Sequence, residues 1–164
     1  MSLQPSAIEL VVADAGPLIA LGRIDRLALL GGVFGQVQIP RAVLAECLAR
    51  PEFPDAQRIK AAVVDGTLLP CEAPPIVASG LQAGERAAIG RAIEIGAALL
   101  ADDRAARLHA SARGLVVIGT LGVLVRAKRI GLLQAVAPLV ERLRAGGHRL
   151  GAAAIAAALS AAQE

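Results

Sequence analysis

Acidic residues at the ends of apolar runs are the first candidates for a functional site in this sequence. Asp14 interrupts the apolar run VVADAGPLIALG, and Asp102 and Asp103 directly follow another apolar run, residues 97–101. A buried carboxylate must be solvated, paired with a cation or held for chemistry, because burying it unpaired is costly. Carboxylate oxygens are the ligands that hard cations such as Mg²⁺ and Mn²⁺ prefer. These residues therefore favour metal-assisted chemistry.

Two glutamates extend this set. Glu46 lies three residues after Val43, so helical geometry places it beside an apolar stripe. Glu85 precedes Ala88 and Ile89 by three and four residues, on the same face of a second predicted helix. Both are predicted to point inward. The alternatives are a solvated carboxylate at the boundary of each stripe or, for Glu85, a first-turn acid favoured by the helix dipole.

Predicted strands and helices alternate along the chain and determine where these acids lie. Apolar, partly β-branched runs predict strands, and runs with a helical period predict helices between them. Strands are expected at residues 8–13, 36–39, 67–69, 97–101 and 115–118. Helices are expected from residue 17 onward and at residues 41–50, 55–64, 83–95, 104–113, 121–130, 132–144 and 152–162.

This alternation predicts an α/β fold with a parallel sheet covered on both faces. Ligands bind such sheets at the carboxyl ends of the strands. Asp14 and the Asp102-Asp103 pair both follow predicted strands, so they are expected along one edge. We expect one domain over residues 1–164, with a core of about residues 8–144 and a C-terminal helical appendage of about residues 150–162.

Composition excludes several classes of protein. Hydrophobic residues make up 55% of the 164 residues and charged residues 19%, which excludes a disordered chain. No apolar stretch approaches the roughly 18 residues of a membrane-spanning helix. Residues 1–10 lack the pattern of a signal peptide, so a cytoplasmic location is expected. Cys47 and Cys71 are far apart and are expected to be reduced and packed.

The net charge of +3 permits a polyanionic partner without establishing one. The chain has no Trp or Tyr and only two Phe residues, so it lacks aromatic platforms for stacking on bases. Any contact with a nucleic acid would be mainly with its backbone.

Several carboxylates in one cleft would repel one another unless cations neutralised them. Paired Mg²⁺ ions can activate a water and stabilise the leaving oxygen of a phosphodiester. Such hydrolysis needs no nucleophilic side chain, and the sequence has no convincing Ser-His-Asp or Cys-His set. His109 and His148 lack metal-ligand spacing and are expected at the surface.

Four segments carry a resemblance to a known family. They are VVADAGPLIAL, IPRAVLAEC, AGERAAIGRAIEIGAALLADDRAAR and VIGTLGVLVRAKRIG, in this order within about residues 8–144. The sequence resembles the PIN-domain family, particularly a branch of predicted nucleic-acid-binding proteins related to VapC toxins. The resemblance implies a three-layer α/β/α fold with a small parallel sheet and extra C-terminal helices. It also implies a Mg²⁺- or Mn²⁺-dependent ribonuclease, often a homodimer, inhibited by a cognate antitoxin protein.

The family's acidic residues map onto this chain one by one. Asp14 matches the first, Glu46 the second, Glu85 the third and Asp103 the fourth, so the resemblance implies that these four are catalytic metal ligands. Asp102, beside Asp103, is a further candidate ligand. The sequence departs from the family at two places. Ala15-Gly16 offers no hydroxyl after the first acid, and Glu85 stands where many members have aspartate.

Basic residues near the predicted site are candidate contacts for an RNA backbone. The candidates are Arg104, Arg107, Lys128 and Arg129, although each also fits a solvated helix face. Thr120 follows a predicted strand in Gly119-Thr120-Leu121-Gly122, where backbone N–H groups could hold a phosphate. An ordinary threonine N-cap is the alternative for Thr120.

Two other functions remain open. One is a PIN-fold module with weak catalysis that uses its acidic cleft to bind a partner protein. The other is a receiver-like phosphoacceptor, prompted by Asp102-Asp103, Thr120 and Lys128. The acidic pair of a receiver follows its first strand, where this chain has Asp14 alone, which disfavours that interpretation.

Overall fold

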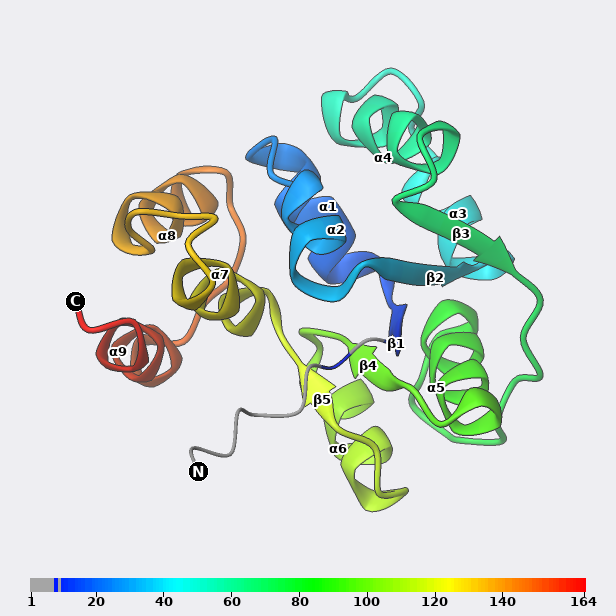
Figure 1. The fold of residues 1–164 in the computed structure, drawn as a ribbon. Coiled ribbons are helices and arrows are strands. Elements are labelled where there is room, and N and C mark those ends of the chain that lie inside the picture. The colour runs from blue at the N-terminus through cyan, green and yellow to red at the C-terminus, as the bar shows by residue number, and fades with distance from the viewer. Residues whose placement is uncertain (1–7, 9) are drawn as a thin grey trace.

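The sheet has five parallel strands in the computed structural model, which describes residue 8 and residues 10–164. Their order across the sheet is β3-β2-β1-β4-β5 (Figure 1). The strands are β1 (Leu10–Ala13), β2 (Gln36–Pro40), β3 (Leu68–Cys71), β4 (Ala98–Leu100) and β5 (Val117–Ile118). The expected absence of an export signal concerns residues 1–10, most of which lie outside the described residues.

The central strand is β1. Val11 aligns with Val37 of β2 on one side and with Ala98 of β4 on the other. Residues 11–13 are fully buried, as expected for a strand covered on both faces. The strand order therefore reverses on either side of β1, which creates a topological switch point between β1 and β4.

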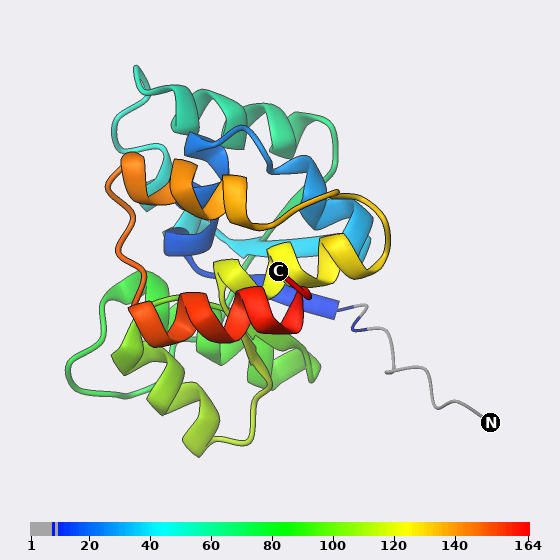
Figure 2. The same ribbon diagram turned by 90° about the vertical axis from the view of Figure 1, so that its left-hand side faces the viewer.

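Helices cover both faces of the sheet. In Figure 1, α5 and α6 lie below the sheet, and α1, α2 and α7 lie above it. The helices are α1 (Ala15–Arg23), α2 (Ala28–Phe34), α3 (Arg41–Cys47), α4 (Pro54–Val64), α5 (Ala83–Ile95), α6 (Arg104–Ala112), α7 (Thr120–Arg129), α8 (Ala137–Ala145) and α9 (Ala152–Ala161). The predicted three-layer α/β/α architecture with extra C-terminal helices is confirmed. In Figure 2, α9 lies in front of the sheet, alongside α7.

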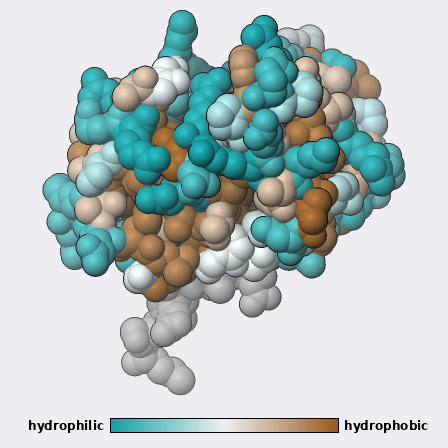
Figure 3. All heavy atoms as spheres, turned by 90° about the horizontal axis from the view of Figure 1, so that it is seen from above, coloured by the Kyte–Doolittle hydropathy of each residue, from teal (hydrophilic) through white to brown (hydrophobic). Residues whose placement is uncertain are grey.

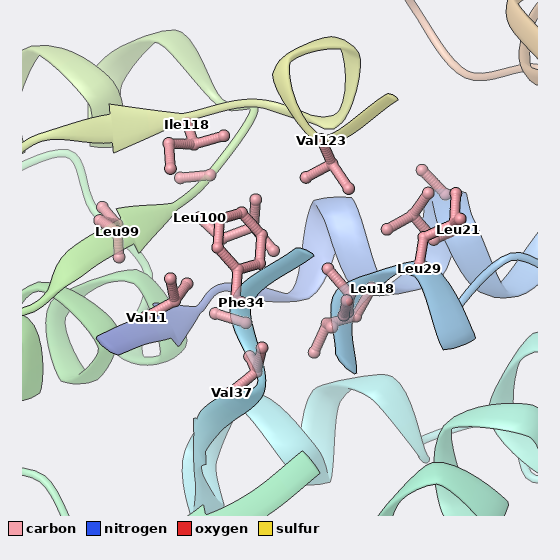
Figure 4. Close-up of a cluster of buried hydrophobic side chains, with 14 of the residues drawn as sticks. Val11, Leu18, Leu21, Leu29, Phe34, Val37, Leu99, Leu100, Ile118 and Val123 are labelled. Atoms are coloured by element: carbon pink, nitrogen blue, oxygen red, sulfur yellow. The ribbon is translucent and has the colours of Figure 1, made fainter. Parts of the chain in front are cut away.

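The core between the sheet and the upper helices is built from aliphatic residues and one aromatic ring. Leu18 of α1, Phe34 of α2 and Val123 of α7 face Leu100 of β4 and Val37 of β2 (Figure 4). Burying a leucine or phenylalanine contributes about 1.5–3 kcal/mol. This packing fixes the helices that begin at the carboxyl edge of the sheet.

Three details differ from the sequence-based expectation. Helix α2 was not predicted, because Gly31-Gly32 suggests a break; the structure uses Gly32 for a close approach of Leu132. The helix expected from residue 132 begins at Ala137. The helical period of residues 83–95 also places Ile93 on the face of Ala88 and Gly96 at the helix end; Ile93 is instead 45% exposed, whereas Gly96 does end α5, in a left-handed conformation.

Several outer helices present polar residues to the surface, whereas the exposed positions of α9 are mostly alanines. Seen from above, the molecule is mostly hydrophilic, with hydrophobic residues gathered toward one side (Figure 3). Within the described residues, none of the helices combines the length and the apolar character needed to cross a membrane.

Candidate metal centre

Asp14 lies at the switch point of the sheet. It follows β1, and its backbone N–H donates to the carbonyl of Leu100 on β4 at 2.9 Å. The residue is only 6% exposed, and its carboxylate makes no capping hydrogen bond to α1. A buried carboxylate without a capping role is the feature that the VVADAGPLIALG pattern suggested.

Other acids act electrostatically on the Asp14 carboxylate. The pKa of Asp14 is raised from 3.8 to about 7, mainly by burial. The N–H of Ala15 acts in the opposite direction, and the charges of Glu85, Glu46 and Asp103 raise the pKa further. The four acids expected to act together therefore lie within electrostatic reach of one another.

Glu46 reaches from α3 toward the first turn of α5. Its Oε2 atom lies 2.8 Å from the position that a Cβ would occupy at Gly84, so the missing side chain of Gly84 leaves room for this carboxylate. Burial and then the charge of Glu85 raise the pKa of Glu46. The residue as a whole is exposed, so it lies at the rim of the site and not within the apolar stripe.

Glu85 has a structural role at the start of α5. Its Oε2 atom accepts a hydrogen bond from the backbone N–H of Gln82 at 2.9 Å, as part of a capping box. The first-turn interpretation of Glu85 is therefore confirmed, while its charge also acts on Asp14 and Glu46.

Asp103 caps the next helix along this edge. Its Oδ2 atom accepts from the backbone N–H of Ala106 at 3.0 Å, at the start of α6. The residue is exposed. Asp103 thus combines a capping role with a negative charge near Asp14.

Asp102 is held differently from its neighbour. Its Oδ1 atom accepts from the backbone N–H of Thr120 at 2.8 Å, and its Oδ2 atom accepts from the hydroxyl of Thr120 at 2.6 Å. Burial raises the pKa of Asp102, but contacts with His148 and Thr120 outweigh burial and hold it below its usual value. Asp102 therefore joins β4 to α7, and both of its oxygens are engaged.

His148 is a site residue that the sequence did not indicate. It was expected at the surface, yet its side chain is only 16% exposed and its Nε2 atom lies 3.2 Å from Oδ2 of Asp102. This nitrogen is buried, and among the described residues it makes this close contact with Asp102 but no hydrogen bond of standard geometry. The connection between α8 and α9 brings His148 to the edge, and long-range contact of this kind leaves no local sequence signal. His109 instead lies beside Arg113 on α6.

The predicted basic contacts have diverse environments. Arg104 is exposed at the start of α6, and Arg107 donates to the carbonyl of Ala101 at 2.9 Å. Lys128 pairs with Glu164 at 3.0 Å, and Arg129 donates to Ala161 at 3.3 Å.

The predicted contact of Thr120 with an RNA phosphate is wrong. This residue is fully buried and both of its donors serve Asp102, so its hydroxyl does not face an RNA backbone. The N-cap of α7 is Gly119, so the expected threonine cap is also wrong.

The charge and oxygen ligands of these acids suit a divalent metal ion. Their side chains, however, do not converge on one position. Among the described residues, no three Asp, Glu, His or Cys side chains lie close enough to coordinate one ion as they stand. The oxygen-only donors Asp14, Glu46, Glu85 and Asp103 nevertheless repel one another at one sheet edge, which a hard cation would relieve. Binding would require side-chain rotation, most easily at exposed Glu46.

Comparisons with known proteins agree with this architecture. The family model DUF3368, described as a PIN domain, matches residues 10–164. No curated protein matches the chain. Among solved structures, a PilT N-terminus domain protein from the hyperthermophilic archaeon Sulfolobus solfataricus P2 has a TM-score of 0.53 and 19% sequence identity. The match covers 70% of this chain and 89% of that chain, and at this identity it shows the fold alone.

Proposed function

We propose that this chain, which belongs to the PIN-domain family DUF3368, is a metal-dependent endoribonuclease that hydrolyses RNA phosphodiester bonds. PIN domains are typically nucleases that use divalent metal ions and commonly bind nucleic acids. The finer assignment to RNA hydrolysis rests on the residues at the sheet edge.

One observation supports the proposal most strongly: three further acids act electrostatically on the buried carboxylate of Asp14. Burial and the charges of Glu85, Glu46 and Asp103 raise the pKa of Asp14 to about 7. Carboxylates that only support the fold do not need to gather at a topological switch point. Perturbed pKa values of this kind are enriched at functional sites.

The roles of the residues follow from their positions. Asp14 is the buried ligand at the centre, Glu46 and Glu85 provide oxygens from α3 and α5, and Asp103 provides one from α6. Bound Mg²⁺ or Mn²⁺ would activate water and stabilise the leaving oxygen. Asp102 keeps the end of β4 in place through Thr120. Arg104, Arg107 and Arg129 are the predicted residues that remain candidates for RNA backbone contacts.

The proposed biological role is a VapC-like toxin, cytoplasmic and homodimeric, paired with an antitoxin protein. Its support is the resemblance of the segments around Asp14, Glu46, Glu85 and Asp103. A gene for a small DNA-binding protein immediately upstream would support this role.

Cleavage of tRNA and mRNA by the purified protein tests the proposed activity. We expect cleavage with Mg²⁺ or Mn²⁺, none with EDTA, and loss of cleavage in Asp14→Asn and Glu46→Gln. Glu52→Gln is the matched control, because Glu52 is exposed and has no hydrogen bond or ion pair with the described residues. Cleavage by wild type and Asp14→Asn at equal rates would contradict the proposal.

A second candidate is the partner-binding module with weak catalysis. The observation that favours it is the use of Glu85 and Asp103 as helix caps, which engages one oxygen of each. RNA cleavage that is absent under all metal conditions, together with a folded protein, would favour this candidate.

The receiver-like interpretation is wrong. The chain belongs to the PIN-domain family, and its strand order 3-2-1-4-5 differs from the 2-1-3-4-5 order of receiver-like folds.

A further inference from the structure

A pocket lies between the end of β5, helix α7 and helix α9. Its volume is about 570 Å³, within the range of small-molecule sites. Four arginines line it: Arg107 of α6, Arg126 and Arg129 of α7, and Arg149 from the connection before α9. These residues come from distant parts of the sequence, so the fold assembles the cluster.

The charges of these guanidinium groups are not paired in salt bridges with the described residues. Within the described part of the chain, none of the four forms a salt bridge, whereas Arg41, Arg58, Arg91 and Arg144 each do. Arg107, Arg126 and Arg129 make single hydrogen bonds to backbone carbonyls. The acid in the pocket wall, Asp102, is already engaged by Thr120. The pocket wall therefore carries four guanidinium groups and a single carboxylate, so it has an excess of positive charge.

Two of these cations affect each other. Burial lowers the pKa of Arg126, and the charge of Arg129 lowers it further. Crowded guanidinium groups are stabilised by an anion that contacts them together. The paired N–H groups of a guanidinium can donate to two oxygens of one phosphate, and two arginines can bind the same phosphate.

The remaining wall is apolar and has small side chains. Leu121 and Val125 of α7 face Ala154, Ala157 and Ala158 of α9 across the pocket. The alanines leave open space where larger residues would fill it. A nucleotide has the matching character, because its phosphate is charged and its base has two apolar faces.

The pocket opens beside the acidic edge. A Cβ at Gly119 would lie 2.9 Å from the Nη1 atom of Arg107 and 3.0 Å from Oδ1 of Asp102, so glycine permits this close approach. Asp102 in turn lies against Gly16, two residues after Asp14. A strand whose scissile phosphate lies near Asp14 would thus have a neighbouring nucleotide within reach of the arginines.

We propose that this pocket binds one nucleotide of the RNA substrate beside the scissile phosphate, with the phosphate on Arg126 and Arg149 and the base against the alanine face of α9. The inference rests on the proposed function, since it assigns a substrate subsite to the same edge. Helix α9 and the connection before it then act in substrate positioning.

Binding of a short fluorescent single-stranded RNA in EDTA, followed by anisotropy, tests the proposal without any cleavage. We expect the Arg126→Gln/Arg149→Gln variant to bind about tenfold more weakly, the size of one lost charge-assisted phosphate contact. For this variant, the slope of the logarithm of the binding constant against the logarithm of the salt concentration should be smaller by about one unit. Arg50→Gln is the control for loss of a single arginine charge elsewhere, because Arg50 follows α3, contacts Phe53 and does not line the pocket.

A second variant changes shape and not charge. Ala157→Leu places a larger side chain in the pocket at an exposed helical position, so we expect a folded protein with similarly weakened RNA binding. RNA binding unchanged in both pocket variants would overturn the proposal.

Two competing ligands test whether the pocket instead binds a free nucleotide or an acidic protein segment. Free adenosine monophosphate that displaces the RNA at equal concentration would show a free-nucleotide site, and polyglutamate that does so would show a site for an acidic protein segment. Either result overturns the subsite. Because no metal is present, loss of RNA cleavage with normal pocket-dependent binding contradicts only the proposed function.

Discussion

The hydroxyl of Thr120 donates a 2.6 Å hydrogen bond to Oδ2 of Asp102, while its backbone N–H donates to Oδ1 of the same carboxylate at 2.8 Å. This pair joins the end of β4 to the start of α7 and leaves Asp102 structurally occupied. Of the two adjacent aspartates, Asp103 is therefore the one available to a metal.

Thr120→Val should destabilise the protein by about 1–3 kcal/mol, because it removes a donor from a largely buried carboxylate. Thr120→Ser keeps the hydroxyl and should retain most of the stability. Urea unfolding of the three proteins measures the difference. A valine variant as stable as wild type would show that the hydroxyl contributes nothing to this edge.

Asp14 should make the stability of the metal-free protein depend on pH. Its pKa is 3.8 ordinarily and about 7 in the folded protein, so the folded state holds the proton more tightly. The resulting contribution to the free energy of unfolding is on the order of a few kcal/mol. It is fully present below about pH 4 and is lost as the pH rises through about 7.

Chemical unfolding in EDTA at pH 5 and pH 8 checks this expectation. Wild type should lose more stability between the two values than Asp14→Asn, which carries no titrating group at this position. Equal losses in the two proteins would place the Asp14 carboxyl in a solvated environment.

Gly84→Ala should weaken metal binding without unfolding the protein. A Cβ at this position would meet Oε2 of Glu46 at 2.8 Å and displace a flexible side chain, while alanine favours the helix. We expect Mn²⁺ affinity to fall about tenfold, as for other residues that orient metal ligands.

Gly16→Ala is the matched control for this variant. It also lies at the second position of a helix at the site, but its Cβ would meet Asp102 only at an ordinary contact of 3.8 Å. Calorimetric titration with Mn²⁺ should separate the two alanine variants. Equal affinities would remove Glu46 from the ligand set.

Cys47 should resist labelling in the folded protein. Its pKa is raised to about 12, first by burial and then by the charges of Glu46, Asp14 and Asp55. Cys71 is only partly buried, so a maleimide should react with Cys71 first and with Cys47 only on unfolding. Mass spectrometry of the labelled protein identifies the site, and rapid labelling of Cys47 would contradict the burial of this side chain.

The fold was largely predictable because its signals are local. Val11 and Val12 mark a buried strand, Gly96 marks a helix end, and both features stand in the structure. Helix α2 was missed because Gly32 meets Leu132, a contact that depends on a distant segment. The single-domain organisation stays a prediction.

Of the residues in the candidate site, only the acids could be predicted from the sequence. Asp14 stood out because it interrupts an apolar run, and its burial agrees with that expectation. Thr120 and His148 were misjudged because their contacts with Asp102 depend on tertiary structure. The arginine pocket was likewise hidden, since Arg149 joins Arg126 only when α9 packs on α7.

Anomalous scattering from crystals soaked in Mn²⁺ at pH 8 would locate the metal directly. We expect an anomalous peak contacting the Asp14 carboxylate, with oxygens of Glu46, Glu85 or Asp103 completing the shell, and no such peak in Asp14→Asn. Well-ordered wild-type crystals without a peak at Asp14 at millimolar Mn²⁺ would contradict this expectation.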